Sequence, residues 1–151
     1  METLTEISSK KIVGVELRTT SDNGVAFDEI PPFWQKFFKE SILEKIPNKL
    51  SKDIFAVYTN FENEGKNNEG QYSLIIGASV ELTQSVPDGF VSTVVPNSTY
   101  QVFNVETGHP EKVGNKWQEI WKHKFNKKRT FLSEYEHYKE SGEINIYIGV
   151  H

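Results

Sequence analysis

Apolar and other residues alternate through the last part of the chain, from Ile144 to Val150. A period of two residues is typical of a strand that buries one of its faces. The segment 133–138 alternates as well, and the residues that share one of its faces are Glu134, Glu136 and Tyr138. A carboxylate within an aromatic strand is either a solvated residue of an edge strand or a charge held in a pocket. The pattern alone leaves both interpretations open.

The same patterns predict further strands and two helices. Runs rich in β-branched and aromatic residues predict strands at 11–18, 53–59, 71–80, 90–95, 99–105, 133–138 and 142–150. Aromatic and aliphatic residues at helical spacing predict one helix that begins near Pro31 and is stopped by Pro47. A second predicted helix carries Trp117 and Trp121, and it ends at the cations of 127–129, as the helix dipole favours.

The order of these elements repeats, and short stretches of the two halves match each other. The matching stretches are 34–38 with 117–121, 55–58 with 135–138, and 74–77 with 146–149. Each match is weak alone, but their order is kept. This predicts two β-α-β-β units at about 7–81 and 88–151, with coincidence as the alternative. Two such units predict an α+β fold with one antiparallel sheet, both helices on one face, and a ligand cleft near the pseudo-two-fold axis.

The predicted cleft offers a chemical role for Glu136. When the two units are aligned, Glu136 falls opposite Ala56, so the halves differ there by one carboxylate. The residues predicted to line the cleft are Glu136, Tyr58, Tyr138, Tyr147, Ile75, Trp121 and Trp34. Aromatic rings attract a cation by about 0.5–2 kcal/mol per contact, and a carboxylate attracts it more strongly as water leaves. This set predicts a site for a lipophilic cation, with a solvated edge position as the alternative for Glu136.

Composition narrows the classes of function. Of the 151 residues, 36% are hydrophobic and 13% aromatic, which favours one domain over 1–151 with a core or pocket built from rings. The formal net charge of −4 argues against binding to nucleic acid or to a membrane surface, because both reward positive patches. The absence of cysteine excludes disulfides and thiolate chemistry, and the 4 histidines form no metal-binding motif. We therefore expect neither a metal nor a cofactor.

Location and mobility can also be predicted from the pattern. No apolar run is long enough to span a bilayer, and the N-terminus lacks the basic and apolar regions of a signal peptide. We therefore expect a soluble protein of the cytoplasm. The polar, glycine-bearing segment 62–70 predicts a mobile, solvated loop, with a contact to a protein partner as the alternative.

An ordered set of short motifs covers essentially the whole chain. In chain order they are Phe55-Ala-Val-Tyr58, Tyr72-Ser-Leu-Ile-Ile-Gly77, Val86-Pro-Asp-Gly-Phe90, Thr99-Tyr-Gln-Val-Phe103, the helix with Trp117 and Trp121, Tyr135-Glu-His-Tyr138 and Ile144-Asn-Ile-Tyr-Ile-Gly149. A chain with this set resembles the gyrase-inhibitor-like family, which shares its fold with the effector-binding domains of AraC- and MerR-type regulators. Within that family it is most similar to the stand-alone integron-associated effector-binding proteins.

The resemblance implies a fold, a ligand class and a site. The fold is a pseudo-symmetric pair of β-α-β-β units, and the central cleft binds amphipathic, often cationic, small molecules with a buried Glu as counter-charge. Glu136 stands at the position of that Glu, and Trp121 falls in the family's helix-borne tryptophan region. The segment 122–128 departs from the family's pattern, so the shape of that wall does not carry over. The chain shows no counterpart of the regulators' helix-turn-helix, so we do not expect a transcription-factor role.

Three functions are compatible with this reading. The first is a binding module that senses or sequesters hydrophobic or cationic small molecules. The second is an enzyme similar to the cyclopropyl hydrolases of the family, in which Glu136 would activate water if burial raises its pKa. The sequence offers no second catalytic group for that chemistry. The third is a protein-interaction role, such as gyrase modulation or partnership with a separate regulator, on family analogy alone. We expect the binding module.

Overall fold

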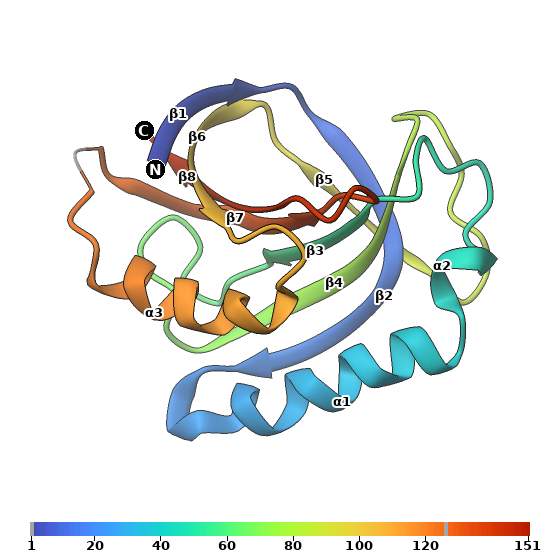
Figure 1. Cartoon of the computed structure of the whole chain (residues 1–151), viewed down its shortest axis with the longest axis horizontal. Helices are drawn as coiled ribbons and strands as arrows, with labels where there is room; N and C mark the ends of the chain where they lie inside the picture. Colours follow the sequence, from blue (N-terminus) through green and yellow to red (C-terminus); the bar gives the residue numbers. More distant parts are fainter. Residues whose placement is uncertain (1, 126) are drawn as a thin grey trace.

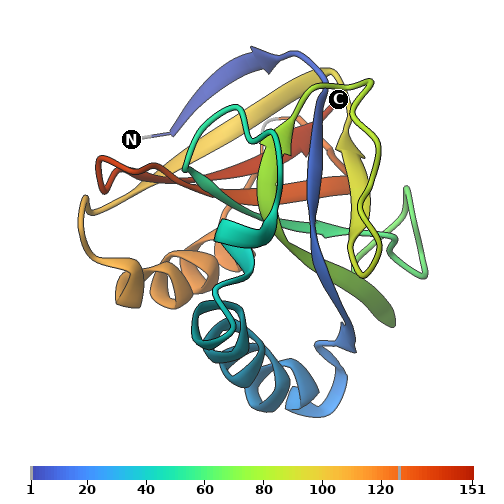
Figure 2. The same cartoon turned by 90° about the vertical axis from the view of Figure 1, so that its right-hand side faces the viewer.

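The alternating stretches become the strands of one antiparallel sheet in the computed structural model, which describes residues 2–125 and 127–151 (Figure 1). Its elements are β1 (Glu2–Ile7), β2 (Lys10–Thr20), α1 (Val25–Lys39), α2 (Ile42–Lys45), β3 (Ile54–Thr59), β4 (Gln71–Val80), β5 (Val91–Val95), β6 (Ser98–Val105), α3 (Val113–Lys122), β7 (Arg129–Tyr138) and β8 (Ile144–Val150). Both long helices lie below the sheet in Figure 1, and they stay on that side when the molecule is turned by 90° (Figure 2).

The order of strands shows how the two halves meet. Across the sheet the order is β1-β6-β8-β7-β3-β4-β2-β5, so β7 and β3 lie at the centre. The units β2-α1-β3-β4 and β6-α3-β7-β8 each supply one half. The strand that precedes each unit in the chain pairs with the other unit, β1 with β6 and β5 with β2. The predicted α+β fold with one antiparallel sheet is confirmed, whereas a true duplication of 7–81 and 88–151 stays a prediction.

The register of the central strands decides which side chains face the helices. Residues directly opposite each other in an antiparallel pair point to the same face. Glu136 of β7 lies opposite Ala56 of β3 and Ile146 of β8. Ala56 belongs to a hydrophobic cluster with Phe37 of α1, and Ile146 belongs to one with Ile120 of α3. Glu136 therefore lies on the face that both helices cover.

The other face of the sheet has an aromatic cluster of its own. Its buried members are Ile12, Phe55, Val57, Val95, Tyr100 and Tyr135. The ring of Tyr135 stacks on the ring of Tyr147 with 4.4 Å between centroids. The ammonium group of Lys10 lies 5.3 Å from the centroid of the Tyr135 ring. The rings of Tyr135 and Tyr147 are therefore engaged on the side away from the helices.

The first long helix starts and ends earlier than predicted. α1 begins at Val25, after Gly24 adopts a left-handed conformation with φ 72°, and both Pro31 and Pro32 lie inside the helix. Each proline removes a backbone donor, but the helix also buries Ala26, one turn before the prolines. Packing on the sheet thus extends the helix past the prolines towards its N-terminus, and the predicted start near Pro31 is wrong.

The end of the same helical run also differs from the prediction. α1 ends at Lys39, and Ser41 has a φ of 50°, so the run breaks before the short α2. Ile46 then takes an extended conformation immediately before Pro47. Pro47 stops α2 rather than one continuous helix.

The second long helix is shorter than predicted. α3 ends at Lys122, and His123 is already extended, with φ −71° and ψ 137°. Arg129 is the first residue of β7, so the cations of 127–129 do not close the helix, and that prediction is wrong. The sequence patterns also did not predict β1, whose apolar Leu4 is 53% exposed.

Hydrogen bonds donated by backbone N–H groups involve the segment 62–70, for which we expected a mobile loop. The Gly65 N–H donates to the Phe131 carbonyl at 3.2 Å, and the Gln71 N–H donates to the Glu62 carboxylate at 3.0 Å. The first bond ties the loop to the start of β7. The loop thereby forms one end of the pocket described next, to which it contributes Asn68.

Candidate functional site

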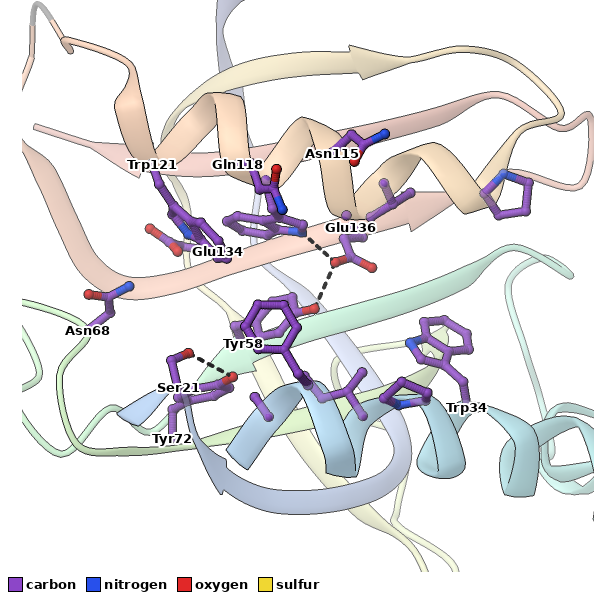
Figure 3. A pocket seen from close by; sticks show the side chains of 18 of the residues that line it. Ser21, Trp34, Tyr58, Asn68, Tyr72, Asn115, Gln118, Trp121, Glu134 and Glu136 are labelled. Atoms are coloured by element: carbon purple, nitrogen blue, oxygen red, sulfur yellow. Dashed lines mark hydrogen bonds between the residues drawn. The ribbon is translucent and has the colours of Figure 1, made fainter. Parts of the chain in front are cut away.

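A pocket of about 980 Å³ lies between α1, α3 and the helix-covered face of the sheet (Figure 3). Its walls are mainly aromatic and aliphatic. Among the residues that line it are Ala26, Phe27, Ile30 and Trp34 of α1, Trp117, Gln118 and Trp121 of α3, and Tyr58, Tyr72, Glu134, Glu136 and Tyr138 of the strands. All 3 tryptophans of the chain are in this wall. A volume near the top of the roughly 300–1,000 Å³ range of ligand pockets suits a drug-sized molecule.

Glu136 lies at the floor of the pocket with both carboxylate oxygens engaged. It is only 2% exposed. The Tyr58 hydroxyl and the Trp117 indole N–H donate to its Oε2 at 2.8 and 2.7 Å. The Tyr138 hydroxyl donates to its Oε1 at 2.5 Å. Two strands and one helix therefore orient this carboxylate.

The partners of Glu136 are all neutral. None of the ion pairs among the described residues includes it. Burial raises the pKa of the Glu136 carboxyl, because a charge in an apolar site is disfavoured, and the three hydrogen bonds oppose that shift. Burial and the nearby carboxylate hold the pKa values of Tyr58 and Tyr138 well above the usual range, so both remain protonated donors.

A second buried carboxylate in the pocket wall does have a cationic partner. The Nε and Nη2 atoms of Arg129 donate to Oε2 of Glu134 at 3.0 and 2.6 Å. The two side chains are 13% and 4% exposed. Their contact depends on a bulge: the pairing of β7 with β8 shifts between Arg129 and Glu134, and Phe131 within it has a φ of 51°. The bulge lets two residues five positions apart meet.

Most of the residues predicted from the sequence lie together in the pocket wall. They are Glu136, Tyr58, Tyr138, Trp34 and Trp121. Trp34 packs edge-on against Tyr138 with centroids 5.3 Å apart, and Trp121 is 51% exposed at the mouth. Their role in ligand binding stays a prediction.

Tyr147 and Ile75 do not lie in the pocket, and their predicted placement is wrong. Tyr147 is opposite Tyr135 in the β7–β8 pair, and Ile75 is opposite Val57 in the β3–β4 pair. Tyr135 and Val57 belong to the cluster on the far face of the sheet. The repeat matched Tyr147 with Ile75, and the two do share a face, but only the pairing register could show that it is the face opposite Glu136.

Among the wall residues that sequence reasoning missed, three take part in the polar contacts described above. Trp117 was used as a landmark but not as a site residue, although it lies one helical turn before Trp121. Glu134 alternates with Glu136 and so was already on the correct face. Arg129 reaches the pocket only through the bulge, for which the sequence carries no clear signal.

Neither a metal site nor a membrane span is found within the described ranges 2–125 and 127–151. No group of three or more His, Cys, Asp or Glu side chains there is arranged to hold a metal ion. No helix there has the length and hydropathy that crossing a membrane requires.

Comparison with known proteins identifies relatives over the full length. The model of the integron-associated effector binding protein family matches residues 3–150. YobU of Bacillus subtilis (strain 168), a candidate transcriptional regulator, is 27% identical over 158 positions that cover 97% of this chain and 96% of YobU.

Two solved structures have a similar fold. The integron cassette protein VCH_CASS2 from Vibrio cholerae superposes with a TM-score of 0.78 at 25% identity, covering 99% of this chain and 95% of its own. SAV2435, solved bound to tetraphenylphosphonium, superposes with a TM-score of 0.80, covering 100% of this chain and 94% of its own. At 18% identity, the second likeness concerns the fold alone. The match over residues 3–150 shows that this chain belongs to the integron-associated effector binding protein family, as its motifs predicted.

Proposed function

We propose that this protein binds amphipathic aromatic cations in the pocket between α1 and α3, with Glu136 as the counter-charge. One observation carries the proposal. Glu136 is 2% exposed, lies at the floor of an aromatic pocket, and accepts hydrogen bonds from three neutral donors but takes part in none of the ion pairs of the described residues. A buried carboxylate without a cationic partner is strongly attracted to a cation that enters the pocket, because water screens little of the interaction there.

The other charges of the pocket favour the same ligand class. Its charged lining consists of the carboxylates of Glu111, Glu134 and Glu136 and the guanidinium of Arg129. Arg129 is already paired with Glu134. The remaining charge is negative, and the aromatic walls add π faces that attract cations. An anion of the same shape would meet repulsion and find no unpaired cation in this wall.

The relatives support the proposal from a second direction. The family is named for effector binding, and SAV2435 was solved with the lipophilic cation tetraphenylphosphonium. YobU is described as a candidate regulator, which agrees with a sensing role for a small-molecule module. The hydrolase and protein-partner alternatives stay predictions, because no observation on the described residues adds a second catalytic group or a partner.

The test is a comparison of two ligands of the same shape and opposite charge. Titrations followed by tryptophan fluorescence should give a dissociation constant at least about tenfold lower for tetraphenylphosphonium than for tetraphenylborate, because only the cation is attracted by Glu136. All three tryptophans lie in the pocket wall, so the fluorescence reports on this site. Equal affinities for the two ions would show that shape and apolar contact alone drive binding, and the proposal would be abandoned.

The affinity for tetraphenylphosphonium should rise with pH. The ligand itself does not titrate, whereas burial raises the pKa of Glu136 above its ordinary value of 4.5. A proton on Glu136 therefore competes with the cation at every pH below this raised pKa, and the competition disappears as the pH passes it. Dissociation constants measured at constant ionic strength between pH 5 and 8 should fall along this window and then level. A flat or opposite dependence would contradict the role of Glu136.

A further inference from the structure

The pocket has a second polar end besides Glu136. It is formed by the ion pair of Arg129 and Glu134 on β7 and by Asn68 of the loop between β3 and β4. Glu134 and Glu136 are two residues apart on one face of the strand, so their Cα atoms are about 7 Å apart at a rise of roughly 3.3 Å per residue. In Figure 3, Glu134 and Asn68 lie toward the left of the pocket and Glu136 toward the right.

This end presents hydrogen-bond donors that the protein itself leaves available. Arg129 uses Nε and Nη2 to bind Glu134. Its remaining nitrogen, Nη1, makes none of the hydrogen bonds found among the described residues. The only fully covered side-chain atoms without a partner among those residues are the hydroxyls of Ser133 and Tyr135, so Nη1 is not shut off from the pocket by the protein. The side-chain amide of Asn68 is half-buried in the wall and also makes none of those hydrogen bonds. A guanidinium carries five N–H donors in a fixed fork, so Arg129 can bind a second acceptor without leaving Glu134.

Charge and size decide what kind of group fits there. The pair of Arg129 and Glu134 is neutral as a whole, so this end attracts a second cation less than Glu136 does. A carboxylate on the ligand would lie close to Glu134 and Glu136 and would be repelled. A neutral oxygen, such as a ketone, ester or amide carbonyl, avoids both problems and accepts from Arg129. The pocket of about 980 Å³ leaves room for such an extension beyond the cation.

We propose that the preferred ligands are aromatic cations that carry a neutral hydrogen-bond-accepting oxygen displaced from the cationic centre towards Glu134, and that the Arg129 guanidinium binds this oxygen. This proposal rests on the cation-binding function above and adds a second point of recognition to it. The alternative is that the ion pair of Arg129 and Glu134 only stabilises the bulge of β7. In that case it has no effect on which cation binds.

A pair of matched ligands separates the two readings. (4-Benzoylphenyl)triphenylphosphonium and (4-benzylphenyl)triphenylphosphonium differ only in a carbonyl or a methylene group, placed para to phosphorus on one ring, a separation comparable to the roughly 7 Å between alternate residues of a strand. Tryptophan fluorescence titrations should show that the parent protein binds the ketone about tenfold more tightly, the effect expected of a hydrogen bond to a charged donor.

The matched variant removes both members of the ion pair. Arg129→Met alone would leave the buried Glu134 without its cation, so the double variant Arg129→Met/Glu134→Leu is used, and its circular dichroism is compared with that of the parent. In this variant the ratio of the two affinities should fall from about tenfold to about one. Arg129→Lys is the second variant: it keeps a cation opposite Glu134 but loses the guanidinium fork, and it should lower the ratio as well.

The outcomes distinguish this inference from the function on which it rests. A ratio near one in the parent protein, or a full tenfold ratio retained in both variants, overturns the role of Arg129. The benzyl compound has the cation but no acceptor, so it tests the proposed function separately. If it fails to bind, or binds Glu136→Gln as tightly as the parent, both proposals fall. If it binds in a Glu136-dependent way and the ketone gains nothing, only the second recognition point falls.

Discussion

Replacing Glu136 by glutamine is expected to weaken the binding of tetraphenylphosphonium about 100-fold. Removing one partner of a buried charge pair costs about 2–5 kcal/mol, and 100-fold corresponds to about 2.7 kcal/mol. The tryptophan fluorescence titration of the parent and of Glu136→Gln, at one ionic strength and pH 8, measures the difference. A variant that binds within twofold of the parent would remove Glu136 from the mechanism.

The geometry explains why this variant should remain folded. A glutamine oxygen in the place of Oε2 still accepts from Tyr58 and Trp117, which donate there at 2.8 and 2.7 Å. The amide nitrogen then takes the place of Oε1 and donates to the Tyr138 hydroxyl, which can reverse its role from donor to acceptor. Loss of affinity would therefore report the lost charge rather than a collapsed pocket.

Stability offers an internal control on the same variant. Burial raises the pKa of Glu136, so the folded state resists its ionisation, and the carboxylate lowers stability as the pH rises above 4.5. Glutamine removes that effect, and Glu136→Gln should be at least as stable as the parent at pH 8 in urea unfolding.

Glu119→Gln is the matched control for binding, because its side chain is 69% exposed on α3 and is absent from the pocket wall. It should bind the cation as the parent does.

Much of the architecture follows from local pattern. Runs rich in β-branched and aromatic residues predicted strands at 71–80 and 142–150, and the structure has β4 over Gln71–Val80 and β8 over Ile144–Val150, both almost fully buried. The alignment of two short aromatic stretches also matched Glu136 with Ala56, and in the structure these two residues lie opposite each other on the central strands β7 and β3. Strand positions and short internal matches depend only on residues that are close together in the chain, so the sequence is enough to predict them.

Features that depend on pairing register were not accessible in the same way. The internal repeat matched Tyr147 with Ile75, and both were assigned to the face of Glu136. The register instead places Tyr147 opposite Tyr135 and Ile146 opposite Glu136. A shift of one residue moves every side chain of a strand to the other face, and no local pattern distinguishes the two faces when both are apolar.

The wall formed by Arg129 depends on a still less visible feature. Cations after an amphipathic helix usually mark its end, and this reading placed 127–129 on α3. The chain instead leaves the helix at His123, and a bulge around Phe131 brings Arg129 back to Glu134. A positive φ is rare for a bulky residue such as phenylalanine, so nothing in the sequence predicts a bulge at Phe131. The ion pair could be recognised only once the fold was in place.

Replacing Arg129 by methionine is expected to lower the free energy of unfolding by about 3–5 kcal/mol at pH 8, because it leaves a buried carboxylate without its cation. Glu134 is 4% exposed, and the described residues provide it with no other side-chain hydrogen bond. Methionine keeps an apolar contact with Phe125 and Phe131, whose ring centroids lie 5.6 and 4.6 Å from the guanidinium carbon. Lost packing is thus kept small, and the charge is what the substitution removes.

The pH dependence and the double variant identify the cause. Burial already raises the pKa of Glu134 against the opposing effect of Arg129, and without the guanidinium that pKa rises further. A carboxyl whose pKa is raised in the folded state lowers the stability of the protein as the pH climbs above its ordinary pKa of 4.5. The difference in free energy of unfolding between Arg129→Met and the parent should therefore widen from pH 5 to pH 8.

Arg129→Met/Glu134→Leu should recover most of the loss, because an apolar pair replaces an ion pair of similar volume. Urea unfolding of the three proteins at both pH values checks this. If the single and double variants were equally unstable, and equally so at pH 5 and pH 8, the packing of the Arg129 side chain on the two rings, rather than its charge, would be what holds the bulge of β7 in place.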